Sequence, residues 1–375
     1  MSATVRLSAL YGGIFFAIGI MMPFWPVWLQ SRGLSATEIG LTIACGSVVR
    51  VFLAPQIARF ADRTGERRRP IICLAIAAFV FYLPFYVADE FWMILLLQAC
   101  AAGMFGPLMP MSESLTMTGA RSQPLNYGRI RLWGSLTFIA GASGIGFFLK
   151  GADPDAIWAS ISVALALVVL ITLFIPDFRS KPAAPESRPF RQVIQDKTFL
   201  LFIMATVCVQ GSHALYYSFG TLNWLRMGLE EGVIGLLWAE GVVAEVILFV
   251  FAADAIRKIG PARLIALGGL ACLIRWGLTA YTDALAVIVL LQLLHAFTFG
   301  AAHLGAIYFI ADRMPEDVSA TAQTVYALVV SGLGVGLMSF VSGHLYDAYQ
   351  GHAYLAMAAL GGTGMIIAWR IRRRQ

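Results

Sequence analysis

Twelve long apolar runs are the feature that most constrains what this chain can fold into. A membrane-spanning helix needs about 20 mostly apolar residues to cross a hydrocarbon core of roughly 30 Å. Short charged or Gly- and Pro-containing turns separate the runs, so the 375 residues leave little sequence for a soluble domain. We expect spans near 8–29, 39–60, 70–88, 92–116, 130–149, 156–175, 199–222, 232–253, 262–281, 285–310, 322–343 and 353–370.

The composition also indicates that a bilayer surrounds the chain. Hydrophobic residues make up 59% of it and charged residues 13%, with a mean hydropathy of +0.76. Soluble domains usually contain about 25% charged residues. All five cysteines lie in apolar runs without the spacing of metal ligands, so we expect no disulfide, no metal site and no cofactor.

Basic residues predict how the chain is oriented in the membrane. Of the 27 Lys and Arg residues, 21 fall on the side of the predicted N-terminus, and only Arg32, Lys150 and Arg226 fall in loops on the other side. Cytoplasmic loops of membrane proteins carry the excess of Lys and Arg. We therefore expect both termini in the cytoplasm, and the net charge of +6 indicates orientation rather than nucleic-acid binding.

A polar segment rich in Pro and basic residues, 176–197, divides the chain into halves. We predict a six-helix bundle over 1–178, a cytoplasmic linker over 179–197 and a second six-helix bundle over 198–375. An acidic residue with basic residues after it follows the second span of each half, at Asp62 and Asp254. Internal duplication explains this pattern, and it predicts an all-α membrane protein with two pseudo-symmetric bundles.

The turn after the second predicted span reads ARFADRTGERRR and resembles the loop motif of the major facilitator superfamily. The matching residues are Asp62, Arg63, Gly65, Arg67 and Arg68, whereas Ala58 replaces the usual leading Gly. The resemblance implies the twelve-helix facilitator fold. In such a loop a carboxylate at a helix end meets basic side chains and forms a latch that opens and closes. The alternative is an ordinary basic loop that only sets orientation.

Longer segments resemble the transporters of one branch of this superfamily. NYGRIRLWGSLTFI at 126–139 is similar to the sugar and proton symporters, and MPFWPVWLQSRGLS, VQGSHALYYSF, LWAEGVVAEVILF and IRWGL are similar to the phenylpropionate permeases. The resemblance spans nearly the whole chain. It implies a monomeric carrier in a bacterial inner membrane that takes up an aromatic monocarboxylate such as 3-phenylpropionate with protons. A sugar or nucleoside symporter is the alternative transporter, and a membrane solute sensor is the alternative of another class.

Glu113 and Arg131 match the paired carboxylate and arginine of the symporter branch. They lie near the same ends of two consecutive predicted spans, so we expect them at one depth. The guanidinium group of Arg131 offers two parallel donors to a substrate carboxylate, and Glu113 holds it when the site is empty. The alternative is a static salt bridge between the helices.

Ionisable residues in the second half predict a proton-coupling site. Glu245, Arg275 and His295 lie at similar depths in three consecutive spans, and ionisable side chains at bilayer depth need partners or water. We expect Glu245 to carry the proton. His303 follows His295 by eight residues, about 80° around an α-helix, so both side chains are expected to face one cavity. A structural, hydrogen-bonded role is the alternative for each histidine.

Aromatic and polar residues of the seventh predicted span complete the expected substrate site. Tyr216 and Tyr217 are the predicted contacts for an aromatic ring, and His213 and Gln210 lie one to two turns away. Trp and Tyr also favour the membrane interface, so we expect an anchoring belt from Trp25, Trp28 and Trp224. The sequence contains no GxxxxGK[ST], HExxH or GxSxG motif, which disfavours ATP-driven transport by this chain and an intramembrane enzyme.

Overall fold

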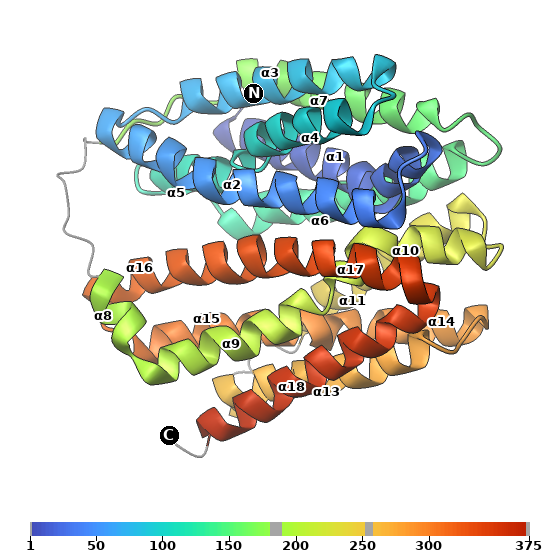
Figure 1. Cartoon of the computed structure of the whole chain (residues 1–375). Helices are drawn as coiled ribbons and strands as arrows, with labels where there is room; N and C mark the ends of the chain where they lie inside the picture. Colours follow the sequence, from blue (N-terminus) through green and yellow to red (C-terminus); the bar gives the residue numbers. More distant parts are fainter. Residues whose placement is uncertain (1, 181–189, 252–257, 373–375) are drawn as a thin grey trace. The chain divides into compact units, whose positions relative to one another are not determined.

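The structure is a computed structural model that describes residues 2–180, 190–251 and 258–372, and this part contains helices and no strand (Figure 1). The first helices are α1 (Ala3–Ser31), α2 (Ala36–Thr64), α3 (Arg68–Tyr82) with η1 (Leu83–Val87), α4 (Phe91–Phe105), α5 (Leu108–Ala120), α6 (Tyr127–Phe148) and α7 (Asp155–Leu173). The later helices are α8 (Phe190–Gln195), α9 (Lys197–Gly211), α10 (Ala214–Arg226), α11 (Glu231–Phe251), α13 (Pro261–Thr279), α14 (Leu285–Leu293), η2 (Ala296–Ala301), α15 (Ala302–Arg313), α16 (Glu316–Tyr326), η3 (Ala327–Gly334), α17 (Val335–Tyr349), η4 (Gln350–Ala353) and α18 (Tyr354–Arg372).

Each of the twelve predicted spans coincides with a helix or with consecutive helices. Among the described residues, 10 ranges are long and apolar enough to cross a membrane. The last of them, Thr321–Ile371, has 51 residues and contains both α17 and α18. The predicted span 130–149 corresponds to α6, which has 22 residues but is not among those ranges. The prediction of an all-α membrane protein is confirmed.

The chain divides into two compact units, which we describe separately. The first comprises Met1–Glu186 with Gly228–Ala239, and the second comprises Ser187–Met227 with Glu240–Gln375. In the first unit, α1 packs on α6 and α7, and α3 packs on α4 and α7. In the second unit, α13 packs on α15 and α18, and α8 packs on α16 (Figure 1). The domain boundaries expected at 178 and 198 stay a prediction, and residues 181–189 of the expected linker and Asp254 lie outside the described residues.

Glycines allow α1 and α6 to pack with their backbones close together. A Cβ atom added to Gly141 would lie 2.7 Å from the carbonyl oxygen of Phe16, whereas one added to Gly144 would meet nothing within 4 Å. Close approach through small residues is a common way for membrane helices to associate. Gly141 therefore sets the distance between these two helices, and Gly144 does not.

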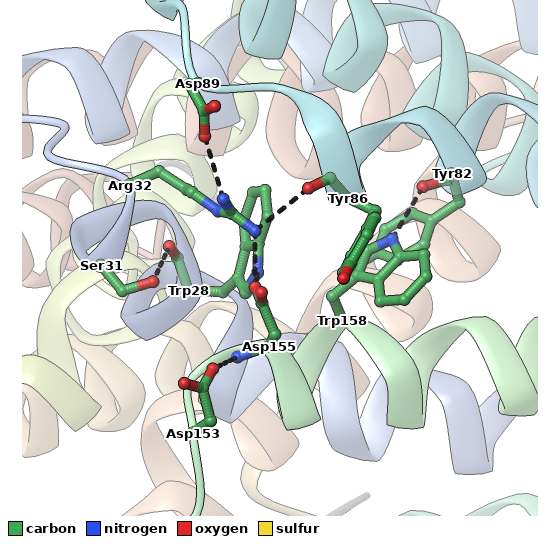
Figure 2. Close-up of polar contacts among 9 residues, drawn as sticks. All are labelled: Trp28, Ser31, Arg32, Tyr82, Tyr86, Asp89, Asp153, Asp155 and Trp158. Carbon is green, nitrogen blue, oxygen red and sulfur yellow. Dashed lines mark hydrogen bonds and ion pairs between the residues drawn. The ribbon is translucent and has the colours of Figure 1, made fainter.

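An ionic cluster fixes one end of the first unit (Figure 2). Arg32, the C-cap of α1, forms ion pairs with Asp89 at 2.9 Å and with Asp155 at 2.6 Å, and donates to the carbonyl oxygen of Tyr86 at 3.3 Å. Trp28 donates its indole N–H to the same Asp155 carboxylate at 3.0 Å. The cluster joins the end of α1 to the α3–α4 turn and to the start of α7.

The expected tryptophan belt is wrong. Trp28 is fully buried and Trp25 is 4% exposed, and their rings stack with centroids 4.6 Å apart. The Trp25 indole donates to Gln98 at 3.0 Å. Trp224, in the second unit, is 2% exposed and lies edge-on to Tyr216. Their indole groups are packed inside the protein, so they do not face the lipid interface.

The start of α9 carries an ion pair outside the predicted spans. Asp196 is the N-cap, accepts hydrogen bonds from the N–H groups of Thr198 and Phe199, and pairs with Arg313 at 3.1 Å. Partial burial raises the pKa of Asp196, but the hydrogen bond from Arg313 and those from the backbone together hold this pKa below its ordinary value. The pair therefore stabilises the second unit most when Asp196 is ionised.

Candidate functional site

A buried arginine lies at the centre of a polar cluster in the second unit. The side chain of Arg275 on α13 is fully buried. Its Nη2 donates to Gln292 Oε1 at 2.7 Å, and its Nη1 donates to Thr298 Oγ1 at 3.2 Å and to His295 Nδ1 at 3.1 Å. No carboxylate forms an ion pair with Arg275 in the described part of the chain. Neutral acceptors alone therefore solvate this cation.

Aromatic rings cover the Arg275 guanidinium group. Its carbon lies 4.8 Å from the ring centroid of Tyr216 and 4.5 Å from that of Trp276. Its Nε is buried and has no hydrogen-bond partner among the residues that the structure describes. A buried cation without an anion in direct contact is costly, because only neutral dipoles replace its lost hydration. The arrangement suits the binding of an anion that carries an aromatic group.

Thr298 connects Arg275 to a second histidine. The Thr298 side chain lies on the π-helical segment η2 and meets His213 Nε2 at 3.0 Å. His213 Nδ1 faces the carbonyl oxygens of Val209 and Gln210 at 3.2 and 3.3 Å. Since carbonyl oxygens only accept, we assign the hydrogen to Nδ1, and the Thr298 hydroxyl donates to Nε2. This assignment gives His213 a neutral ring.

His295 links Arg275 to Glu245. An arginine side chain only donates, so Nδ1 of His295 accepts from Arg275 and its hydrogen lies on Nε2. That Nε2 is 4.0 Å from the Glu245 carboxylate. The structure thus brings together the three residues that the sequence predicts at one depth. Their role in proton coupling stays a prediction.

His303 joins this group through a column of stacked rings. The rings of His295 and Phe299 are 5.4 Å apart at 6°, and those of Phe299 and His303 are 5.8 Å apart at 8°. The expected separation of about 80° between the histidines assumes an α-helix, and this assumption is wrong because η2 is a π-helix. In a π-helix the backbone hydrogen bonds join residues five apart, which widens the turn. Side chains four residues apart then lie nearly one above the other along the helix.

The tyrosines and Gln210 occupy different positions around the cluster. The Tyr216 hydroxyl donates to Gln292 Oε1 at 3.1 Å, so Gln292 receives hydrogen bonds from both Tyr216 and Arg275. The Tyr217 ring stacks near His213 at 5.6 Å. Gln210 is buried and contributes its backbone carbonyl to His213.

Three residues of the cluster were missed by the sequence analysis, namely Gln292, Thr298 and Trp276. They carry no charge, so the need of buried ionisable groups for partners does not predict them. Gln292 had a usable signal, because it is the single polar residue of the α14 run LAVIVLLQL and stands three residues before His295.

Glu113 and Arg131 lie on neighbouring helices of the first unit, but the expected pair is not a direct contact here. Glu113 accepts a hydrogen bond from the Tyr127 hydroxyl at 3.2 Å. The Arg131 guanidinium carbon lies 4.1 Å from the centroid of the Phe15 ring. No ion pair joins the two side chains in the structure as described. Tyr127 is therefore the group that holds the Glu113 carboxylate.

Arg67 of the loop motif connects three parts of the first unit. It pairs with Asp62 at 3.2 Å, and it donates to Ser114 on α5 at 2.6 Å and to Ser180 after α7 at 2.7 Å. The side chain of Arg67 is largely buried. These contacts fix the α2–α3 loop against α5 and the segment after α7, and the gating role of the loop stays a prediction.

The other predicted loop residues have separate environments. Gly65 ends α2 in the left-handed conformation with φ +70°, and its carbonyl oxygen accepts from the N–H of Ser180 at 3.2 Å. Only glycine adopts this conformation without strain. Arg68 donates to the carbonyl oxygen of Leu173 at 2.8 Å, whereas Arg63 is exposed.

Comparisons with known proteins agree with the fold. A family model described as the MFS_1 like family matches residues 4–356. A protein of Escherichia coli (strain K12) described as a probable 3-phenylpropionic acid transporter is 31% identical over 367 residues, which cover 96% of this chain and 95% of that protein. The maltose permease of Geobacillus stearothermophilus is 27% identical and is covered to 93%.

Solved structures show the same fold at low identity. The nucleoside transporter NupG superposes with a TM-score of 0.85 at 13% identity, covering 100% of this chain and 99% of that one. A D-xylose-proton symporter superposes with a TM-score of 0.73 at 15% identity, covering 98% and 97%. The chain therefore belongs to the MFS_1 like family, within the major facilitator superfamily, and it is a membrane transporter and not an enzyme.

Proposed function

We propose that the protein is a proton-coupled symporter of an aromatic monocarboxylate. The observation that carries this proposal is the fully buried Arg275 guanidinium group, which has neutral acceptors, aromatic rings on its faces and a free Nε donor. A substrate carboxylate supplies an anionic partner in direct contact with Arg275, and its ring packs against Tyr216 and Trp276. The 31% identical relative, described as a probable 3-phenylpropionic acid transporter, supports 3-phenylpropionate as the test substrate.

Charge balance in the cluster supports one proton for each substrate. In the empty cluster, Arg275 carries one positive charge and Glu245 one negative charge, and His213 and His295 are neutral. A bound carboxylate adds one negative charge at a site where net charge is costly. Protonation of Glu245, with His295 between it and Arg275, restores neutrality. The loaded carrier is then as neutral as the empty one and crosses between its two states by alternating access.

Uptake into proteoliposomes tests this assignment. Radiolabelled 3-phenylpropionate is offered with and without an inward proton gradient to wild type, Arg275→Gln, Arg131→Gln and Glu245→Gln. We expect Arg275→Gln to lose uptake, Arg131→Gln to retain more of it, and Glu245→Gln to keep exchange but lose accumulation. If Arg131→Gln abolishes uptake and Arg275→Gln does not, Arg131 binds the carboxylate, as the sequence predicts.

A sugar or nucleoside symporter is the second candidate. The group of Glu113, Tyr127 and Arg131 in the first unit supports it, since a carboxylate and a guanidinium group suit hydroxyl groups. Accumulation of a labelled disaccharide or nucleoside by wild-type protein that ignores 3-phenylpropionate would replace the first proposal with this one. For either substrate we propose a monomer in the inner membrane with both termini in the cytoplasm, as the basic loops predict.

A further inference from the structure

A cavity in the first unit lies apart from the Arg275 cluster, at the end where α1 and α3 begin and α7 ends. Its volume is about 490 Å³, and it is lined by Arg6, Arg68 and residues 173–177. Arg6 belongs to the second turn of α1, and Arg68 is the first residue of α3. The cavity therefore places two guanidinium groups from different helices beside the last turn of α7.

The charges around this cavity favour an anion. Arg68 uses one Nη to donate to the carbonyl oxygen of Leu173, and its Nε is buried without a partner in the described part of the chain. Neither Arg6 nor Arg68 has an ion pair among the described residues. Asp177 also lines the cavity, but its carboxylate pairs with Arg179 at 3.1 Å. Two guanidinium groups thus remain for an occupant, and a phosphate group suits their geometry.

An exposed apolar stripe on α7 leads to the same cavity. Val163, Leu167, Leu170 and Phe174 are 69%, 44%, 57% and 68% exposed. Their spacing of four, three and four residues places them on one face of the helix. From Val163 to Phe174 the stripe rises about 16 Å, roughly half of a 30 Å hydrocarbon core. Val163 therefore lies near mid-membrane when Phe174 and the cavity lie at the headgroup level.

We propose that this cavity binds the phosphate group of an anionic phospholipid, whose acyl chains lie along the α7 stripe. The two arginines contact the phosphodiester, and Phe174 separates it from the hydrocarbon core. A soluble anion would use the arginines but not the stripe. The bound lipid joins the N-terminal ends of α1 and α3 to the end of α7, and this role does not depend on which substrate the carrier transports.

Native mass spectrometry of the purified full-length protein tests the site. Dioleoyl phosphatidylglycerol and dioleoyl phosphatidylcholine are titrated into wild type, Arg6→Gln with Arg68→Gln, and a matched control, Arg121→Gln with Arg129→Gln. Both control arginines are exposed on the first unit outside the cavity. Because each basic residue near the surface adds about 1 kcal/mol of attraction, we expect phosphatidylglycerol binding to weaken about fivefold for each cavity arginine removed. The control pair is expected to change binding much less.

Two further arms keep the test decisive. The double lysine variant of Arg6 and Arg68 keeps both charges, so we expect it to retain most of the preference for phosphatidylglycerol; equal loss in the lysine and glutamine variants would contradict the site. Soluble glycerophosphoglycerol carries the same phosphodiester without acyl chains and is expected to bind far more weakly. If it binds as tightly as the lipid, or if the glutamine variant binds the lipid like wild type, the proposal is wrong.

Discussion

Replacing Gln292 with glutamate tests the role of Arg275 most directly. The Oε1 atom of Gln292 lies 2.7 Å from Arg275 Nη2 and 3.1 Å from the Tyr216 hydroxyl. Gln292→Glu changes little in shape but gives Arg275 a carboxylate partner inside the protein. Gln292 already accepts from a charged guanidinium group, so the substitution adds an ion pair, and measured couplings between close charge pairs begin at about 1.5 kcal/mol. A coupling of about 1.5 kcal/mol makes Arg275 a poorer receptor for a second carboxylate.

We expect this variant to bind 3-phenylpropionate about tenfold more weakly, because 1.4 kcal/mol corresponds to about a factor of ten. Its thermal unfolding temperature should stay above that of Gln292→Met, because the carboxylate still accepts from Arg275 and Tyr216. Isothermal titration calorimetry at pH 8, where a glutamate paired with arginine is ionised, measures the dissociation constant, and a thermal scan measures stability.

Gln292→Met is the matched control for this experiment. It removes the acceptor without adding charge, so two buried donors, on Arg275 and Tyr216, lose a partner. We expect the unfolding temperature to fall while carboxylate binding persists, because an unsatisfied buried donor costs about 1–3 kcal/mol. A folded Gln292→Glu protein with wild-type affinity for 3-phenylpropionate would refute the role of Arg275 in carboxylate binding.

Two other predictions concern stability. Gly141→Ala places a methyl group 2.7 Å from a backbone oxygen of α1 and should destabilise the protein by about 1–3 kcal/mol. A methyl group in Gly144→Ala meets nothing within 4 Å, so that variant should be neutral or slightly stabilising. Similar unfolding temperatures for the two variants would show that α1 and α6 separate easily. Asp196→Asn keeps the N-cap but loses the charge that pairs with Arg313, so it should cost up to about 1 kcal/mol at pH 7. The pKa of Asp196 is lowered in the folded state, so this contribution is present above the unfolded pKa of about 3.9 and disappears as the pH falls through the folded pKa. The unfolding temperatures of wild type and Asp196→Asn should therefore converge between pH 7 and pH 3. A difference that stays constant over this range would contradict the assignment.

The sequence predicted the spans and the main charged cluster for a physical reason. An ionisable side chain in an apolar run needs a partner or water, so the sequence pointed to Glu245, Arg275 and His295 at one depth, and in the structure His295 lies between the other two. Neutral side chains such as Gln292 and Thr298 do not need a partner so strongly, so the sequence does not predict where they lie. Their contribution became visible only when the helices were placed in three dimensions.

Other features depended on packing that periodicity does not encode. The statistical preference of tryptophan for membrane interfaces predicted a belt, but Trp28 lies inside an ionic cluster whose partners come from residues 86–89 and 155 (Figure 2). The spacing of His295 and His303 was read as α-helical, and the π-helical segment between them changed their relation. The direct contact expected between Glu113 and Arg131 is not formed in the described structure, where Glu113 accepts from Tyr127 and the Arg131 guanidinium group lies over the Phe15 ring.

The π-helical segment η2 links the geometry of one helix to the hydrogen bonds of the Arg275 cluster. A π-turn holds one residue more than an α-turn between its hydrogen-bonded groups. Closing it to an α-turn would rotate the following helix by about 100° and shift it by about 1.5 Å, the increments for one residue. Thr298 lies inside this segment and touches Arg275, whereas His303 lies beyond it. A change of register at η2 would therefore change the hydrogen bond from Arg275 to Thr298 and, at the same time, the direction in which the His303 side chain points.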